Sequence, residues 1–156
     1  MITSDFIGDI VTAGLRQLGA SEIKEVRNGA LFIARFHLEN GLELAYAFNI
    51  TRQEQFFLQR TAPYPMSYGR FDNADAIVGF IKADIENFRN AQNSSNFQSF
   101  LETSETYRTA IVEWEQLFLT RNVSKEAMQR MKTSAEELLG AIRKAYSDCP
   151  EIELNK

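Results

Sequence analysis

The chain has one cysteine and one histidine among its 156 residues, and each scarcity excludes a class of protein. A single cysteine, Cys149, forms no disulfide within the chain, which is typical of a reducing compartment. One histidine without a neighbouring cysteine does not make the ligand set of a zinc site. The sequence also lacks a glycine-rich phosphate loop, a nucleophile elbow and a zinc-protease helix motif. We therefore predict no metal, no cofactor and no catalytic residue, and we favour a non-enzymatic protein.

An excess of basic charge is also missing. The 17 basic residues are scattered among 21 acidic ones, which gives a net charge of −4 and a sequence pI of about 5.1. Nucleic-acid binders normally carry a basic stripe that neutralises phosphates, so we expect no nucleic-acid partner. No apolar run approaches the ~20 residues of a membrane helix, and Asp5 and Asp9 interrupt the first apolar stretch. We expect no membrane partner, no signal peptide and a cytoplasmic location.

The residues that are abundant favour a globular domain with a ring-rich core. Hydrophobic residues make up 44% of the chain, and 12 of its residues are phenylalanine. Aromatic side chains bury a large area each, so a core of this composition needs no disulfide or metal. The length predicts one domain, which we place at 1–147, followed by a loose acidic tail at 148–156.

Hydrophobic periodicity predicts an N-terminal helix and then a sheet. Apolar residues recur at helical spacing over 4–18, and Gly19 is placed to end that helix. The pairs Asn28-Gly29 and Asn40-Gly41 lie between apolar runs, which is the strongest short signal for a hairpin turn. We predict a four-stranded antiparallel meander with strands at 21–27, 30–38, 42–50 and 54–61. One face is apolar throughout, and Leu31 and Ile33 make the other face partly apolar.

Three helices complete the predicted α+β fold, at 73–90, 96–120 and from Ser124 to about 146. The last two are expected to form a helical hairpin. The helix at 96–120 is longer than a sheet of short strands can cover. The apolar surface that neither the sheet nor the last helix covers suggests a homodimer interface. The order of elements is similar to that of small secretion chaperones, which implies an acidic, cytosolic, dimeric protein; three consecutive C-terminal helices depart from that family.

The stretch RTAPYPMSYGRF, residues 60–71, is the candidate binding segment. Its two prolines should stop the fourth strand. One interpretation is a rigid crossover from sheet to helix whose rings pack on the protein's own core. Another is a contact surface, because interfaces favour Tyr, Met, Phe and Arg. A third is a small anion site at the start of the next helix, although Asp72 and Asp75 would oppose an anion. The contact residues would be Arg60, Tyr64, Met66, Tyr68, Arg70 and Phe71.

Three other features, namely His37, Cys149 and the pair Met128 and Met131, have both a structural and a functional interpretation. His37 is expected to be a sheet-surface histidine rather than a catalytic base, because no nucleophile partner is evident. Cys149 lies between Asp148 and Pro150 and is expected to be an incidental thiol rather than a reactive one. Met128 and Met131 could line a soft binding groove, but core packing is the simpler interpretation.

Two functions from different classes follow. The first is a non-enzymatic, acidic protein-interaction module: an adaptor, a dedicated chaperone, or an inhibitor or immunity-type protein, acting as a homodimer. The alternative is a small-molecule-binding protein or enzyme with a pocket at the Tyr64–Phe71 loop. The sequence does not choose the partner, and it does not say what covers the second face of the sheet.

Overall fold

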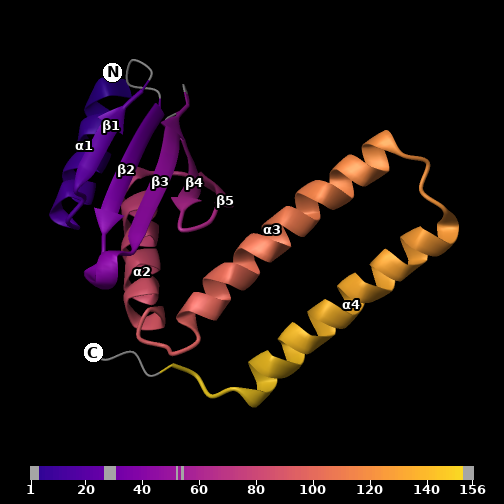
Figure 1. Cartoon of the computed structure of the whole chain (residues 1–156). Helices are drawn as coiled ribbons and strands as arrows, with labels where there is room; N and C mark the ends of the chain where they lie inside the picture. Colours follow the sequence, from indigo (N-terminus) through magenta and orange to yellow (C-terminus); the bar gives the residue numbers. More distant parts are fainter. Residues whose placement is uncertain (1–3, 27–30, 52, 54, 153–156) are drawn as a thin grey trace. The chain divides into compact units, whose positions relative to one another are not determined.

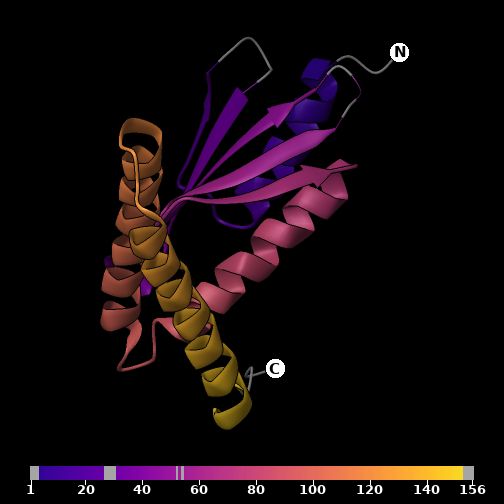
Figure 2. The same cartoon turned by 90° about the vertical axis from the view of Figure 1, so that its right-hand side faces the viewer.

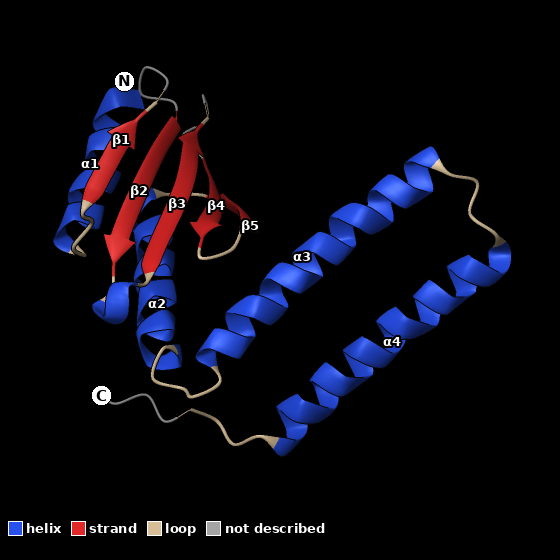
Figure 3. Cartoon of the chain, in the orientation of Figure 1, coloured by secondary structure: helices blue, strands red, loops and turns tan. Residues whose placement is uncertain are grey.

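The computed structural model describes residues 4–26, 31–51, 53 and 55–152 (Figure 1). In chain order the elements are α1 (Ser4–Gln17), β1 (Glu22–Glu25), β2 (Leu31–His37), the 3-10 turn η1 (Glu39–Gly41), β3 (Glu43–Ile50), β4 (Phe56–Ala62), β5 (Met66–Phe71), α2 (Ala74–Ala91), α3 (Phe97–Thr120) and α4 (Lys125–Asp148). The predicted α+β class is confirmed, and Figure 3 separates the strands from the helices. Contacts divide the chain into two compact units, Met1–Glu105 and Thr106–Lys156.

The first unit is an antiparallel sheet with two helices on one face. Its strands lie in the order β1-β2-β3-β4-β5, so each strand pairs with the next in sequence. Strict alternation puts one set of side chains on the inner face, and β3 contributes Leu44, Tyr46, Phe48 and Ile50. α1 and α2 cover this face (Figure 2) and bury their own apolar stripes against it. Burial of this continuous core is the main stabilising term of the unit.

The predicted turn at Asn40-Gly41 is confirmed. Both residues have positive φ, 65° for Asn40 and 79° for Gly41, which is the conformation that favours Asn and Gly over other residues. The predicted turn at Asn28-Gly29 lies outside the described residues. Gly19 ends α1 with a φ of 92°, as its position after the apolar stripe predicted.

The prediction of four strands is wrong, because the sheet has a fifth strand, β5. Pro63 and Pro65 lie in the turn between β4 and β5 and do not end the sheet. The strand is hidden in the sequence because its alternation is broken. Leu58 pairs with Gly69 but Gln59 pairs with Ser67, so Tyr68 is an extra residue in the ladder. Gly69, with a φ of 79°, supplies the bend that such a bulge needs.

The three C-terminal helices occur as predicted, and α3 and α4 form the expected helical hairpin. The Asn73 side chain caps α2 by accepting a hydrogen bond from the Ala76 amide at 2.8 Å. Ser124 caps α4 in the same way through the Ala127 amide, at 3.1 Å. Both α3 and α4 have 24 residues. Among the described residues, no helix is long and apolar enough to cross a membrane.

Candidate interaction surface

The predicted contact residues in the 60–71 stretch are divided by the fold, and two of them, Tyr64 and Tyr68, enclose the buried cation of a third, Arg60. Arg60 lies on β4 and is only 2% exposed. Its guanidinium carbon lies 4.5 Å from the ring centre of Tyr64 and 5.5 Å from that of Tyr68. Phe88 of α2 adds a third ring at 4.7 Å. A guanidinium is weakly hydrated and stacks well on rings, so this enclosure lowers the cost of its burial.

The charge of Arg60 is neutralised by Asp84 of α2. Nη1 of Arg60 donates to both carboxylate oxygens of Asp84, at 3.0 and 2.9 Å. The Tyr46 hydroxyl, from β3, donates to the same carboxylate at 2.8 Å. Nε of Arg60 is buried and has no hydrogen-bond partner among the described residues. These three residues therefore link two strands to α2 through one polar centre, which we call the Arg60 cluster together with Tyr64 and Tyr68.

Burial raises the pKa of two tyrosine hydroxyls in the Arg60 cluster, those of Tyr46 and Tyr68. The pKa of Tyr46 is raised well above its usual value, first by burial and then by the Asp84 carboxylate, against an opposing effect of Arg60. The pKa of Tyr68 is raised by the same causes in the same order. Both groups stay protonated at neutral pH.

The other three predicted contact residues lie apart from this centre. Met66 and Arg70 are exposed on β5. Arg70 faces across the ladder toward Phe57 of β4, which is also exposed. Phe71 packs against Phe80 of α2, with ring centres 5.3 Å apart. The structure thus brings Arg60, Tyr64 and Tyr68 together and leaves Met66 and Arg70 on the surface.

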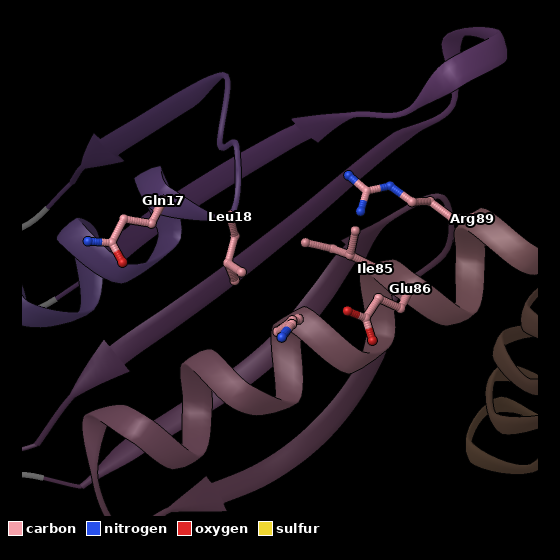
Figure 4. Close-up of a pocket in the computed structure, with 6 residues that line it drawn as sticks. Gln17, Leu18, Ile85, Glu86 and Arg89 are labelled. Atoms are coloured by element: carbon pink, nitrogen blue, oxygen red, sulfur yellow. The ribbon is translucent and has the colours of Figure 1, made fainter. Parts of the chain in front are cut away.

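A small pocket lies elsewhere in the first unit, between the end of α1 and α2 (Figure 4). Its volume is about 230 Å³, and its lining includes Leu18, Glu86 and Arg89. Small-molecule sites in proteins typically enclose ~300–1,000 Å³ and are mostly apolar. In Figure 4 Glu86 and Arg89 come from neighbouring turns of α2, and Gln17 and Leu18 come from the end of α1. This pocket is smaller and more charged than a typical ligand site.

The outer face of the sheet carries a partly exposed ionic network at its β1 side. Arg35 pairs with Glu22 at 3.1 Å and with Glu43 at 2.7 Å. His37, which is exposed, has Nδ1 at 2.8 Å from the Ser21 hydroxyl oxygen and Nε2 at 3.4 Å from Glu43. Exposed ion pairs contribute little to stability, so the network mainly keeps this face polar at its β1 side. The described residues include no group of three or more potential ligand side chains placed to bind a metal.

Most of the large apolar side chains that the described residues expose belong to the second unit. We call the part of α3 from Thr106 onward, with α4, the hairpin. Across residues 106–152 no described residue is buried. Ile111 is 65% exposed, Trp114 48% and Phe118 58%. The other large apolar side chains that it exposes are Tyr107, Val112, Leu117, Leu119, Leu138, Leu139, Ile142 and Tyr146. Met128 and Met131 are half-buried. The two helices therefore do not bury each other's apolar side chains.

These exposed residues follow a heptad pattern, which the predicted helices at 96–120 and from Ser124 to about 146 did not include. In α3, positions spaced alternately three and four residues apart are Phe97, Phe100, Ser104, Tyr107, Ile111, Trp114 and Phe118. In α4 they are Met128, Met131, Ala135, Leu138, Ile142 and Ala145. Apolar residues at this spacing form the packing seam of coiled coils and helix bundles. We call these two rows the α3 seam and the α4 seam.

The start of the α3 seam is already packed within the first unit. Phe97 lies against Phe88, with ring centres 6.4 Å apart, and Phe100 lies against Tyr64 at 5.7 Å. Tyr64 is one of the rings of the Arg60 cluster, so that cluster also supports the first turns of α3. Further along the seam, Ile111, Trp114 and Phe118 are exposed.

Searches against protein-family models, curated protein sequences and solved structures found no match to this chain. A functional proposal therefore depends on the chain's own residues.

Proposed function

We propose that the chain is a non-enzymatic, cytoplasmic protein-interaction module that works as a homodimer. It would act as an adaptor, a dedicated chaperone, or an inhibitor or immunity-type protein. The observation that supports this function best is the hairpin, which exposes a row of large apolar side chains on each helix. Proteins rarely leave a continuous apolar surface of this size uncovered unless it binds something.

The composition of the hairpin fits a protein interface better than a lipid or nucleic-acid contact. Interface cores are enriched in Trp, Tyr, Phe and Met, and the hairpin presents Trp114, Tyr107, Phe118 and Met128 along its seams. Binding energy at such surfaces concentrates on a few large side chains near the centre. Trp114 is the single tryptophan of the chain and lies in the α3 seam. We expect it to be the residue that contributes most.

The net charge of the chain favours a basic partner where that partner is a different protein. At −4 the chain would attract a positively charged surface, and such attraction raises association rates more than affinity. Exposed seam residues would supply the affinity. An inhibitor or a dedicated chaperone for a basic protein combines these two requirements.

Affinity capture with matched variants tests the proposal. Tagged wild type, Trp114→Ala and Glu113→Ala would be incubated with lysate of the source cells, and bound proteins identified by mass spectrometry. Glu113 is the neighbouring exposed residue outside the α3 seam. We expect one defined set of proteins with wild type and Glu113→Ala, reduced at least about tenfold with Trp114→Ala, since a central tryptophan typically contributes 2 kcal/mol or more. Equal capture by all three proteins would contradict the role of the hairpin.

The alternative proposal is a small-molecule-binding protein or enzyme that uses the Tyr64–Phe71 loop. One observation favours it: Nε of Arg60 is buried beside aromatic side chains, and none of the residues that the structure describes is its hydrogen-bond partner. Native mass spectrometry of gently purified protein separates the two functions. A stoichiometric small adduct on the wild type, lost with Arg70→Ala, would favour the alternative. An adduct that Arg70→Ala retains would count against this loop as its site.

A further inference from the structure

Two hairpins can complete one helix bundle, and a single hairpin cannot. An antiparallel pair of helices that closes by itself needs apolar residues only at the two seam positions of each heptad. The chain has more than that. α3 adds Ala110 and Leu117 along one flank of its seam, and α4 adds Leu139 and Tyr146. An apolar stripe of three positions per heptad is the pattern of a four-helix bundle, in which each helix contacts two neighbours.

We infer that the hairpin binds the hairpin of a second copy of this chain, so that α3 and α4 of both copies form a four-helix bundle. This inference rests on the proposed function, because it names the partner of the same surface. It also assigns the homodimer to one part of the chain. The pair would be related by a twofold axis, since one surface patch faces its own copy.

The dimensions of the hairpin fit this arrangement. The hairpin contains residues 106–120 of α3, about 22 Å at 1.5 Å per residue, and the 24 residues of α4, and only residues 121–124 connect the two helices. Short connections are usual in antiparallel bundles. Phe97 and Phe100 pack in the first unit, so the α3 seam that is left for a bundle extends from Tyr107 to Phe118. The packing layers of four helices can coincide over this length.

The exposed area is sufficient for a stable dimer. The large apolar side chains along the seams and their flanks expose roughly half of their surface, which amounts to on the order of 1,000 Å² per chain. A stable interface of standard size buries roughly 800 Å² on each partner. Covering this surface with an identical one would therefore produce an interface of ordinary size with an apolar core.

Sedimentation velocity of the full-length protein tests the inference, with one variant on each seam and one control. Ile111→Glu and Leu138→Glu place a charge in the α3 and α4 seams, and Gln116→Glu adds the same charge on the opposite side of α3. We expect the wild type and Gln116→Glu to sediment as a dimer, at twice the chain mass of 17.8 kDa. Ile111→Glu and Leu138→Glu should dimerise at least about 100-fold more weakly, because each buries an unpaired charge twice in a symmetric interface.

Circular dichroism and urea unfolding of each variant show whether the sheet unit is still folded. The substituted positions lie outside that unit, so its transition should be unchanged. A wild-type dimer that survives both seam substitutions would overturn the inference and leave the homodimer of the proposed function in place, on another surface. A wild-type monomer would also overturn the inference, and the Trp114→Ala capture experiment would then decide separately whether the hairpin binds a different protein.

Discussion

Arg60 and Asp84 form a salt bridge that joins β4 to α2, with Nη1 of Arg60 2.9 Å from Oδ2 of Asp84. Twenty-four residues separate them in the chain, and their side chains are 3% and 13% exposed. A buried charge needs a partner, because the desolvation of an unpaired ion is costly. We therefore expect the pair to favour this position of α2 on the sheet over positions that would leave the guanidinium unpaired.

Replacing Asp84 should destabilise the first unit strongly. Asp84→Asn removes the counterion of a buried guanidinium, and we expect the free energy of unfolding to fall by about 3 kcal/mol. Glu86→Gln is the matched control, because Glu86 is an exposed acid on the same helix, and its effect should stay within about 0.5 kcal/mol. Urea unfolding followed by circular dichroism measures both. Equal effects of the two substitutions would contradict the role of the Arg60 cluster.

The raised pKa of Tyr46 predicts a loss of stability at high pH. A tyrosine in the unfolded chain loses its proton near pH 10, whereas folded Tyr46 keeps its proton to higher pH. Above about pH 10 the unfolded state therefore binds fewer protons than the folded state, and the free energy of unfolding falls as pH rises. Below pH 10 the contribution of Tyr46 is complete.

Tyr46→Phe checks this dependence by difference. At pH 8 the variant should be less stable than the wild type by about 2 kcal/mol, since it loses a hydrogen bond to a charged carboxylate. That difference should narrow as pH rises above 10. Unfolding of the wild type then releases the Tyr46 proton, which lowers its free energy of unfolding, whereas the variant has no hydroxyl at this position. Urea unfolding of both proteins from pH 8 to 11 provides the comparison. A constant difference across this range would show that Tyr46 titrates normally.

Replacing two helical glycines, Gly79 and Gly8, by alanine should change the free energy of unfolding in opposite directions. Gly79 in α2 has open space where a Cβ would be, so Gly79→Ala should raise the free energy of unfolding by about 0.5–1 kcal/mol through helix propensity. A Cβ at Gly8 in α1 would lie 2.9 Å from Cζ of Phe32, whose ring stacks on Phe48. Overpacking there should outweigh the propensity gain, with a net loss of about 1 kcal/mol. Thermal unfolding distinguishes a raised from a lowered midpoint.

Local signals predicted most of the fold. The β3 alternation of Leu44, Tyr46, Phe48 and Ile50 identified the core face, because a half-buried strand needs a period of two. Helix ends were also predictable where a single side chain determines them, as Ser124 does for α4. β5 was missed because the bulge at Tyr68 destroys that period. Prolines beside a bulged strand give the same sequence pattern as a loop.

The candidate sites depended on relations that no local pattern contains. Tyr46, Arg60 and Asp84 lie on three different elements, so their meeting follows only from the packing of α2 on the sheet. The seams are different, because their spacing is visible in the sequence. Ile111, Trp114 and Phe118 already have a heptad period, and counting at 3.5 residues per turn in place of 3.6 would have found it. The spacing alone does not show whether those residues are buried within one chain or left exposed.

Trp114 fluorescence on dilution of the full-length wild type tests the central claim most directly. Trp114 is the only tryptophan and lies in the α3 seam, so its emission reports whether the seam is covered by a second copy. The four-helix bundle predicts a blue-shifted, poorly quenched emission at high protein concentration. On dilution the emission should shift to the red and become accessible to acrylamide, at the concentration where sedimentation shows the dimer dissociating. An emission that is independent of protein concentration over the range in which the mass changes, or a mass that never exceeds 17.8 kDa, would contradict the account.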